Sequence, residues 1–181
     1  MATQLNYTKL KTKIEDRAKN ELYPTDPLWV EALLHFIKLP KNVWECATSP
    51  NGPITLVLKK HGHKVFESDI ATGTDFLTSK RKDDAIITNP PFSLWDQFAL
   101  QGLKLSRSVL VLLGSHFHLT GGTTRFKEIL YPYPPTAIIQ VVNKMKVFGK
   151  PSVFTHCWFV WDKREPQGTT LFYWTNSKEL P

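Results

Sequence analysis

The chain has 181 residues, of which 41% are hydrophobic and 22% are charged, and its formal net charge is +7. This length and composition are typical of one globular α/β domain and exclude a disordered or fibrous chain. The positive charge favours a polyanionic partner. The two cysteines give neither a disulfide framework nor a metal-ligand spacing. We find no signal peptide in the polar first 20 residues and no apolar run of membrane-spanning length, so a cytoplasmic location without membrane contact is expected.

The chain begins with a lysine-rich segment at residues 1–21, which predicts a basic N-terminal arm ahead of a single domain over residues 22–181. A turn at residues 23–27 follows, in which Thr25 or Asp26 can cap the next helix. The further expected elements, in chain order, are a helix at 28–37, a strand at 42–47, a loop at 48–53, a helix from Pro53 that Gly62 ends, a strand at 64–70, a loop at 72–83, a strand at 85–88, a helix at 93–105 capped by Ser93, and strands at 109–113, 136–142, 153–161 and 170–174.

Strand and helix alternate through the first two-thirds of this order. Such alternation predicts an α/β fold of the doubly wound, Rossmann-like kind, with a mostly parallel sheet and right-handed crossovers. The closing strands are expected to add an antiparallel C-terminal edge. Two histidine pairs, His61 with His63 and His116 with His118, have spacings that could mimic metal ligands, but a turn and a strand end explain them, and no metal site is predicted.

The strand over residues 85–88 runs directly into Asn89-Pro90-Pro91-Phe92. Two prolines stop the strand because neither can donate to a β-ladder. At the carboxyl end of a strand, where open α/β sheets bind ligands, the Asn89 side chain and a backbone carbonyl could both accept from one NH2 group while Phe92 stacks on the attached ring. The alternative is a plain surface turn after a core strand.

A doubly wound domain usually binds a nucleotide-like cofactor after its first strand, with an acidic residue after the second strand on the ribose. Here the first loop is residues 45–53 and the acid is Asp69. Asp75 and Phe76 in the next loop could bracket an adenine, with the carboxylate taking its amine and the ring packing on its face.

Several stretches in this order resemble the phage-type and restriction-type DNA N6-adenine methyltransferases, which use S-adenosylmethionine (SAM). The similar stretches are Tyr23-Pro24-Thr25-Asp26-Pro27-Leu28-Trp29-Val30, Trp44-Glu45-Cys46-Ala47 with Gly52-Pro53-Ile54, the strand to Asp69 and Ile70, Asp75-Phe76-Leu77, Asn89-Pro90-Pro91-Phe92 and Trp158-Phe159-Val160-Trp161-Asp162-Lys163.

This resemblance implies a SAM-dependent methyltransferase fold and transfer of a methyl group to the N6 amine of adenine in DNA. The implied catalytic residues are Asn89, Pro90, Pro91 and Phe92. The implied cofactor-binding residues are Tyr23, Thr25, Glu45, Ala47, Ser49, Asn51, Gly52, Asp69, Ile70, Asp75, Phe76 and Asn89. The target base must be flipped out of a duplex or lie in a single strand, and the implied location is the cytoplasm of a bacterium or a phage-infected host.

The first loop departs from the family, whose glycines let the backbone approach SAM closely. The segment Thr48-Ser49-Pro50-Asn51-Gly52 keeps only the last glycine, and Pro50 removes an N–H. Two interpretations stay open. Ser49, Asn51 and Gly52 hold SAM in another way, or the chain is a catalytically inactive, methyltransferase-like DNA-binding or partner subunit.

No separate target-recognition domain fits this length, so DNA contacts are expected from basic residues interleaved with aromatic ones. The candidates are Lys11, Lys13, Arg125, Lys127, Lys144, Lys146 and Lys150. A protein partner or a homodimer is compatible with the sequence. So is a third function, methylation of adenine in RNA or of another planar amine.

Overall fold

The computed structural model describes residues 24–120, 122–142, 146–147, 150–151, 155–176 and 178. The expected arm at residues 1–21 lies outside the described residues, as does Tyr23. The strands are β1 (Asn42–Glu45), β2 (Lys64–Glu67), β3 (Asp83–Thr88), β4 (Ser106–Ser115), β5 (Ala137–Val141), β6 (Lys146–Val147), β7 (Lys150–Pro151), β8 (His156–Asp162) and β9 (Leu171–Thr175). The α-helices are α1 (Pro27–Phe36), α2 (Pro53–Lys60), α3 (Trp95–Leu105), α4 (His116–Thr120) and α5 (Thr123–Arg125).

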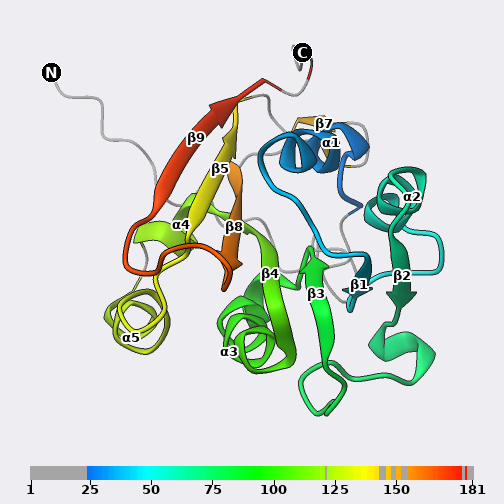
Figure 1. The fold of residues 1–181 in the computed structure, drawn as a ribbon, viewed down its shortest axis with the longest axis horizontal. Coiled ribbons are helices and arrows are strands. Elements are labelled where there is room, and N and C mark those ends of the chain that lie inside the picture. The colour runs from blue at the N-terminus through cyan, green and yellow to red at the C-terminus, as the bar shows by residue number, and fades with distance from the viewer. Residues whose placement is uncertain are drawn as a thin grey trace, which may run out of the picture.

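Seven strands form one sheet in the order β2-β1-β3-β4-β8-β5-β9, which runs from right to left in Figure 1. β1 pairs in parallel with β2 and β3, and β3 pairs in parallel with β4. Only β8 runs the other way, between β4 and β5, and β9 pairs in parallel with β5. The predicted α/β class with a mostly parallel sheet and an antiparallel C-terminal part is confirmed. The antiparallel strand is flanked on both sides, and β9 is the outermost strand.

Helices cover both faces of this sheet, so two hydrophobic cores form (Figure 1). Strand residues alternate between the faces, as the period of two requires. In β1, Val43 packs with α1 and α2, whereas Trp44 packs with α3 on the other side. The side chains that anchor the α1 and α2 face include Trp29, Leu33, Ile54 and Leu58. Those that anchor the α3 face include Trp95, Phe98, Ile129 and Phe159.

Several element boundaries near the carboxyl ends of the strands differ from the sequence prediction. β1 ends at Glu45 and not at residue 47, and β4 extends to Ser115 and not to residue 113. β2 ends at Glu67 and not at residue 70, because Asp69 caps a 3-10 turn over Ile70–Thr72. Ser93 does not cap α3, because Phe92–Leu94 forms a 3-10 turn and the helix begins at Trp95. The predicted cap at Asp26 is confirmed: its carboxylate accepts from the Leu28 backbone N–H at 3.0 Å.

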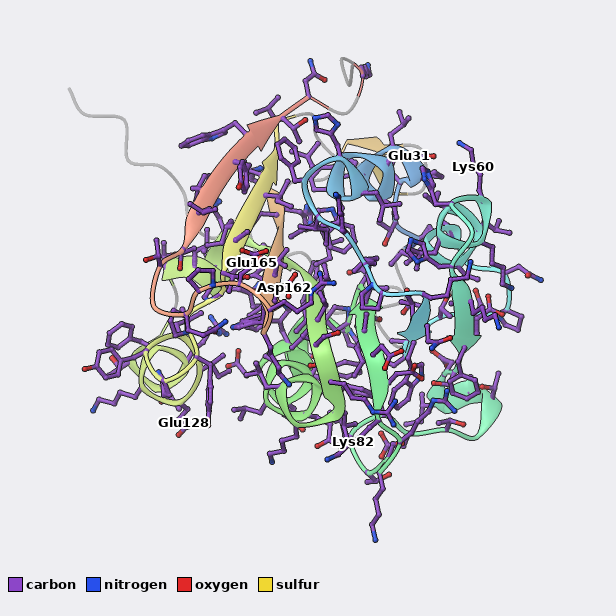
Figure 2. The ribbon with its side chains drawn as sticks, in the orientation of Figure 1. Glu31, Lys60, Lys82, Glu128, Asp162 and Glu165 are labelled. Carbon is purple, nitrogen blue, oxygen red and sulfur yellow. The ribbon has the colours of Figure 1, made fainter. Side chains whose placement is uncertain are left out.

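The amino-terminal helices are tied together at the surface. Glu31 on α1 reaches Lys60 at the end of α2 at 2.8 Å and the His61 ring at 2.6 Å, as Figure 2 shows for the Glu31 and Lys60 side chains. Among the described residues, no helix combines the length and the apolarity that a membrane crossing needs. In the same part of the chain, no group of three or more His, Cys, Asp or Glu side chains is placed to hold a metal ion.

Candidate functional site

The carboxyl ends of the parallel strands place the predicted cofactor and catalytic segments at one edge of the sheet. The loop at residues 46–52 follows β1, Asp69 follows β2, and the Asn-Pro-Pro-Phe turn at residues 89–92 follows β3. Because β2, β1 and β3 are direct neighbours in the sheet, segments that are distant in sequence meet here.

Glu45, the last residue of β1, is a buried carboxyl group with an exposed fraction of 1%. Its Oε1 accepts from the Ala47 backbone N–H at 3.2 Å. Its Oε2 has no hydrogen-bond partner of normal geometry among the described residues, and the nearby Thr88 hydroxyl also lacks one. Burial raises the pKa of Glu45 to about 8, and the negative charges of Glu67 and Asp69 add to this rise, while the Thr88 hydroxyl and the Ala47 N–H act against it. Such a carboxyl group is open to a donor or a cation that binds at this edge.

The loop between β1 and α2 is closed by its own contacts. The Asn51 backbone, at a φ of 56°, donates its N–H to Glu67 Oε1 at 3.1 Å. The Gly52 N–H donates to the Ser49 carbonyl at 3.0 Å. A Cβ on Gly52 would lie 2.1 Å from Thr48 Oγ1, so a residue without a side chain is needed for Gly52 to pack this closely against Thr48. The backbone N–H groups of Asn51 and Gly52 are therefore hydrogen-bonded within the protein and are not available to a cofactor. Ser49 is exposed and stays a candidate cofactor ligand in this loop.

Two carboxylates, not one, follow the end of β2. The Asp69 Oδ1 accepts from the Ala71 N–H at 2.8 Å, and its half-buried side chain lies two residues beyond the strand. Glu67 is the last strand residue, and it holds the Asn51 N–H and pairs with Lys59 at 3.5 Å. The sequence analysis missed Glu67, although its place at a strand end was a usable signal. The predicted neighbour Ile70 is 66% exposed and offers an apolar surface beside Asp69.

The Asp75-Phe76 prediction is corrected in one respect. The Asp75 carboxylate is half-buried and fixed by the Leu77 N–H at 2.9 Å and the Thr78 hydroxyl at 3.1 Å. The Phe76 ring, however, is 2% exposed and lies in the core, stacked on Phe98 with ring centroids 4.9 Å apart. A buried ring leaves no face for an adenine, so the predicted packing of Phe76 on the base is not possible in this structure.

The Asn-Pro-Pro-Phe turn projects from the end of β3 and is fixed by its surroundings. Pro90 is buried, Asn89, Pro91 and Phe92 are half-buried, and the Leu94 N–H donates to the Pro91 carbonyl at 2.9 Å. The Phe92 ring packs between two imidazoles that the sequence analysis did not assign to the site, with centroids 5.7 Å from His118 and 5.4 Å from His156.

The amino-terminal segment that the resemblance assigned to the cofactor reaches the same region through α1. Thr25 is 4% exposed just before this helix. Trp29 on α1 packs edge-on against His156 at 6.2 Å, and its carbonyl accepts from Trp158 Nε1 at 3.0 Å. α1 is thus connected through one imidazole ring to Phe92.

The predicted nucleic-acid contacts divide into four groups. Arg125 has an internal role that the prediction did not foresee, because its guanidinium pairs with Asp96 and donates to the Phe117 carbonyl at 2.9 Å. Lys127 is exposed. Lys146 and Lys150 lie on the short β6–β7 ladder, where only the backbone is described, and Lys11, Lys13 and Lys144 lie outside the described residues.

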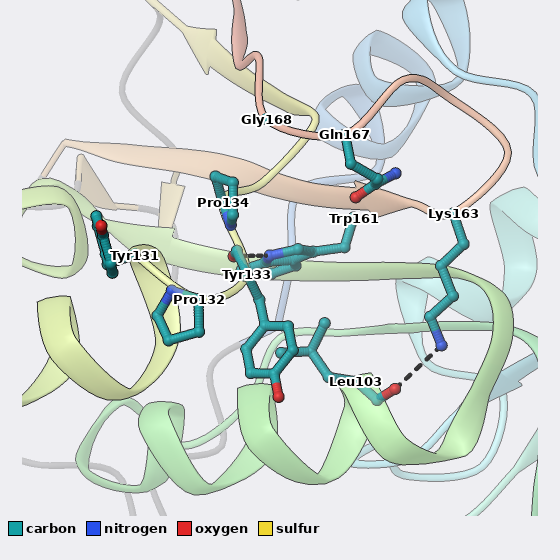
Figure 3. Close-up of a pocket in the computed structure, with 9 residues that line it drawn as sticks. All are labelled: Leu103, Tyr131, Pro132, Tyr133, Pro134, Trp161, Lys163, Gln167 and Gly168. Atoms are coloured by element: carbon teal, nitrogen blue, oxygen red, sulfur yellow. Dashed lines mark hydrogen bonds between the residues drawn. The ribbon is translucent and has the colours of Figure 1, made fainter.

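A cavity of about 560 Å³ lies away from these segments (Figure 3). Its lining comes from the end of α3, from residues that precede β5 and from residues at and beyond the end of the antiparallel β8, so it opens at the amino-terminal edge of the parallel strands. Trp161 Nε1 donates to the Tyr133 carbonyl at 2.8 Å, and Lys163 donates to the Leu103 carbonyl at 3.0 Å. These polar groups are therefore engaged in holding the cavity walls.

The fold is similar to that of solved methyltransferase structures. The methyltransferase subunit of a type I restriction-modification system from Streptococcus thermophilus superposes with a TM-score of 0.58 at 14% identity, over 91% of this chain and 49% of that chain. A putative class I SAM-dependent methyltransferase from Listeria monocytogenes gives a TM-score of 0.56 at 13% identity, over 83% of this chain and 64% of that chain. The chain thus spans about half to two-thirds of their lengths. No family model and no curated protein sequence matches it.

Proposed function

We propose that the protein is a SAM-dependent methyltransferase that acts on the N6 amine of adenine in DNA. The observation that carries the proposal is the meeting, at one sheet edge, of the Glu45 carboxyl group, Asp69 and the Asn-Pro-Pro-Phe turn. The fold match to a restriction-modification methyltransferase subunit supports DNA as the substrate.

The residues at this edge fit the cofactor in charge and in position. Glu45 offers a buried carboxyl oxygen without a hydrogen-bond partner among the described residues, which suits a cationic or N–H-bearing group. Asp69 and Glu67 are the candidates for the ribose hydroxyls, Asp75 for the adenine amine, and Ile70 for an apolar contact. SAM supplies an electrophilic methyl group on a sulfonium.

The turn supplies the groups that act on the substrate amine. Its nitrogen is a weak nucleophile because the lone pair is delocalised into the ring. Asn89 Oδ1 and the Pro90 carbonyl accept hydrogen bonds from its two N–H groups. These hydrogen bonds favour tetrahedral geometry at the nitrogen and stabilise the positive charge that develops there. Phe92 stacks on the base and sets the angle of attack. The methyl group would come from the SAM sulfonium, and one proton of the amine would leave to water.

A second candidate function has its own observation. The loop over Thr48–Gly52 directs the Asn51 and Gly52 N–H groups to internal acceptors. A subunit that keeps the fold without methyl transfer would tolerate such a closed loop, and a partner could complete its cofactor site.

Methyl transfer from tritiated SAM tests the proposal. Wild-type protein is expected to label unmethylated DNA, and Asn89→Ala is expected to abolish labelling while SAM still binds. Gln97→Ala, which removes an exposed amide on α3, serves as the matched control and keeps activity. Labelling of RNA or protein but not DNA would select the other-amine alternative. No labelling of any substrate, with SAM bound, would select the inactive subunit.

A further inference from the structure

His118 connects the end of β4 to the Asn-Pro-Pro-Phe turn. It lies on α4, directly after β4, and is 4% exposed. The Ser115 backbone N–H donates to His118 Nδ1 at 2.8 Å, and the Ser115 hydroxyl lies 3.1 Å from the same nitrogen. The Ser115 carbonyl lies 3.3 Å from the same nitrogen, so the backbone and the side chain of Ser115 together anchor this edge of the ring.

The same ring contacts the turn in two ways. It packs on Phe92 at 5.7 Å and on Trp95 at 4.6 Å between ring centroids. A backbone contact with Phe92 also acts on the imidazole, and because this contact favours the protonated ring, the group concerned is the Phe92 carbonyl. That carbonyl can accept a hydrogen bond from the ring.

The surroundings keep the ring neutral. Burial and the positive charge of Arg125 on α5 together lower the pKa of His118 to about 4, while Asp96 on α3 acts in the opposite direction. The remaining titratable neighbour is His156 on β8, which packs on the Phe92 ring that lies between the two imidazoles. The ring is therefore neutral over the physiological range.

We propose that His118 is a positioning residue that fixes the Asn-Pro-Pro-Phe turn, with its neutral imidazole joined to Ser115 on one side and to Phe92 on the other. The inference rests on the proposed methyl transfer at this turn. His118 acts through Phe92 and the turn backbone. Its role is to hold the Phe92 ring, the Pro90 carbonyl and the Asn89 amide in one geometry, and small displacements of such groups are costly to rate.

Two variants separate the hydrogen bonds from the packing. His118→Phe keeps an aromatic ring on Trp95 and removes both hydrogen bonds, whereas His118→Gln keeps a side-chain amide that can donate to the Phe92 carbonyl. His116→Phe is the matched control, since His116 is exposed on the same short helix. The measurements are the single-turnover rate of methyl transfer at saturating SAM, the SAM dissociation constant, and hydrogen exchange of the Leu94 amide, which donates to Pro91.

We expect His118→Phe to lower the rate by about 10- to 100-fold, to leave SAM affinity nearly unchanged, and to speed exchange at Leu94. His118→Gln is expected to restore part of the rate and part of the protection from exchange at Leu94. His116→Phe is expected to change neither the rate nor the exchange. If His118→Phe lowers only the melting temperature and leaves rate and exchange at wild-type values, the inference is overturned. If His118→Phe does not fold, equal rate and exchange in His118→Gln and in a Gly substitution at 118 would overturn it.

Exchange also separates this inference from the proposed function. A wild-type protein that transfers no methyl group, together with faster Leu94 exchange in His118→Phe that His118→Gln reverses, would refute the function and retain the positioning role. An active wild-type protein with unchanged exchange and rate in His118→Phe would support the proposed function and refute the positioning role.

Discussion

Glu45 shows how a single side chain can be costly to the fold and useful to the site. Its carboxyl group is buried at the end of β1 with one oxygen unpartnered among the described residues. A buried polar group of this kind is destabilising until a ligand supplies the missing hydrogen bond or charge.

The raised pKa of Glu45 predicts a specific pH dependence of stability. A carboxyl group with a folded pKa of about 8 favours the folded state fully below the unfolded value of 4.5, and this contribution is lost as pH rises through 8. Glu45→Gln stays neutral, so it is expected to gain stability over wild type as pH rises, by on the order of 3–5 kcal/mol at pH above about 8. Urea unfolding of both proteins across this range measures the difference.

The exposed carboxylate of Glu128 provides the control, and Glu128→Gln should show no comparable growth with pH. Equal stability differences for Glu45→Gln at pH 5 and pH 8 would contradict the account.

Individual residues were predictable where the signal is local. The role of Asp26 as a helix cap follows from its own side chain and the proline after it, and the structure confirms this role. The inward ring of Phe76 was not predictable, because whether a loop aromatic faces a ligand or the core depends on partners such as Phe98 from a distant helix. His118 and His156 were unassigned for the same reason: the pairing of β4 with β3 and with β8 brings them to Phe92.

At the scale of elements, the loop after β1 is the part that departs most from the family it resembles. Its closure depends on Gly52, on the left-handed Asn51 and on the Glu67 carboxylate. The sequence indicated the missing glycines and the Pro50 obstacle, but it did not indicate that β2 would supply Glu67 to bind the loop.

Gly52→Ala tests this closure. The new Cβ would meet Thr48 Oγ1 at 2.1 Å, so Thr48 must rotate and give up its hydrogen bond to the Ser49 carbonyl. We expect a loss of about 1–2 kcal/mol in the free energy of unfolding. Adding Thr48→Ala removes the clashing oxygen, so the double variant should be more stable than the sum of the single variants predicts. Additive effects in denaturant unfolding would show that the two residues do not interact.

For the whole molecule, the order of the strands in the sheet could not be predicted from the sequence, whereas the number of strands and the class of sheet largely could. Alternating strands and helices gave a doubly wound sheet, but the insertion of β8 between β4 and β5 and the addition of β9 outside β5 depend on long-range pairing. As a result, β8 places His156 beside the Asn-Pro-Pro-Phe turn, while its other end lines a cavity at the opposite edge.

The net charge of +7 predicts how the affinity for nucleic acid would depend on salt concentration. Contacts made by lysines to phosphates release counterions, so affinity should fall steeply with salt, by about 10- to 1,000-fold between roughly 50 and 200 mM. Sequence preference should be weak, and Lys127→Ala should weaken binding equally for unrelated sequences. Fluorescence anisotropy with labelled duplexes and single strands measures both. Affinity that does not change with salt would rule out this mode of binding.

Calorimetric titration of SAM is the most direct test of the central claim, that the carboxyl edge of β1, β2 and β3 binds this cofactor. The account predicts saturable binding by the wild-type protein and a loss of at least about tenfold, or 1.4 kcal/mol, in Asp69→Ala. Gln167→Ala, in the cavity at the other edge, should bind as wild type does. Absence of binding to the wild-type protein, or equal binding by Asp69→Ala, would contradict the assignment of the site.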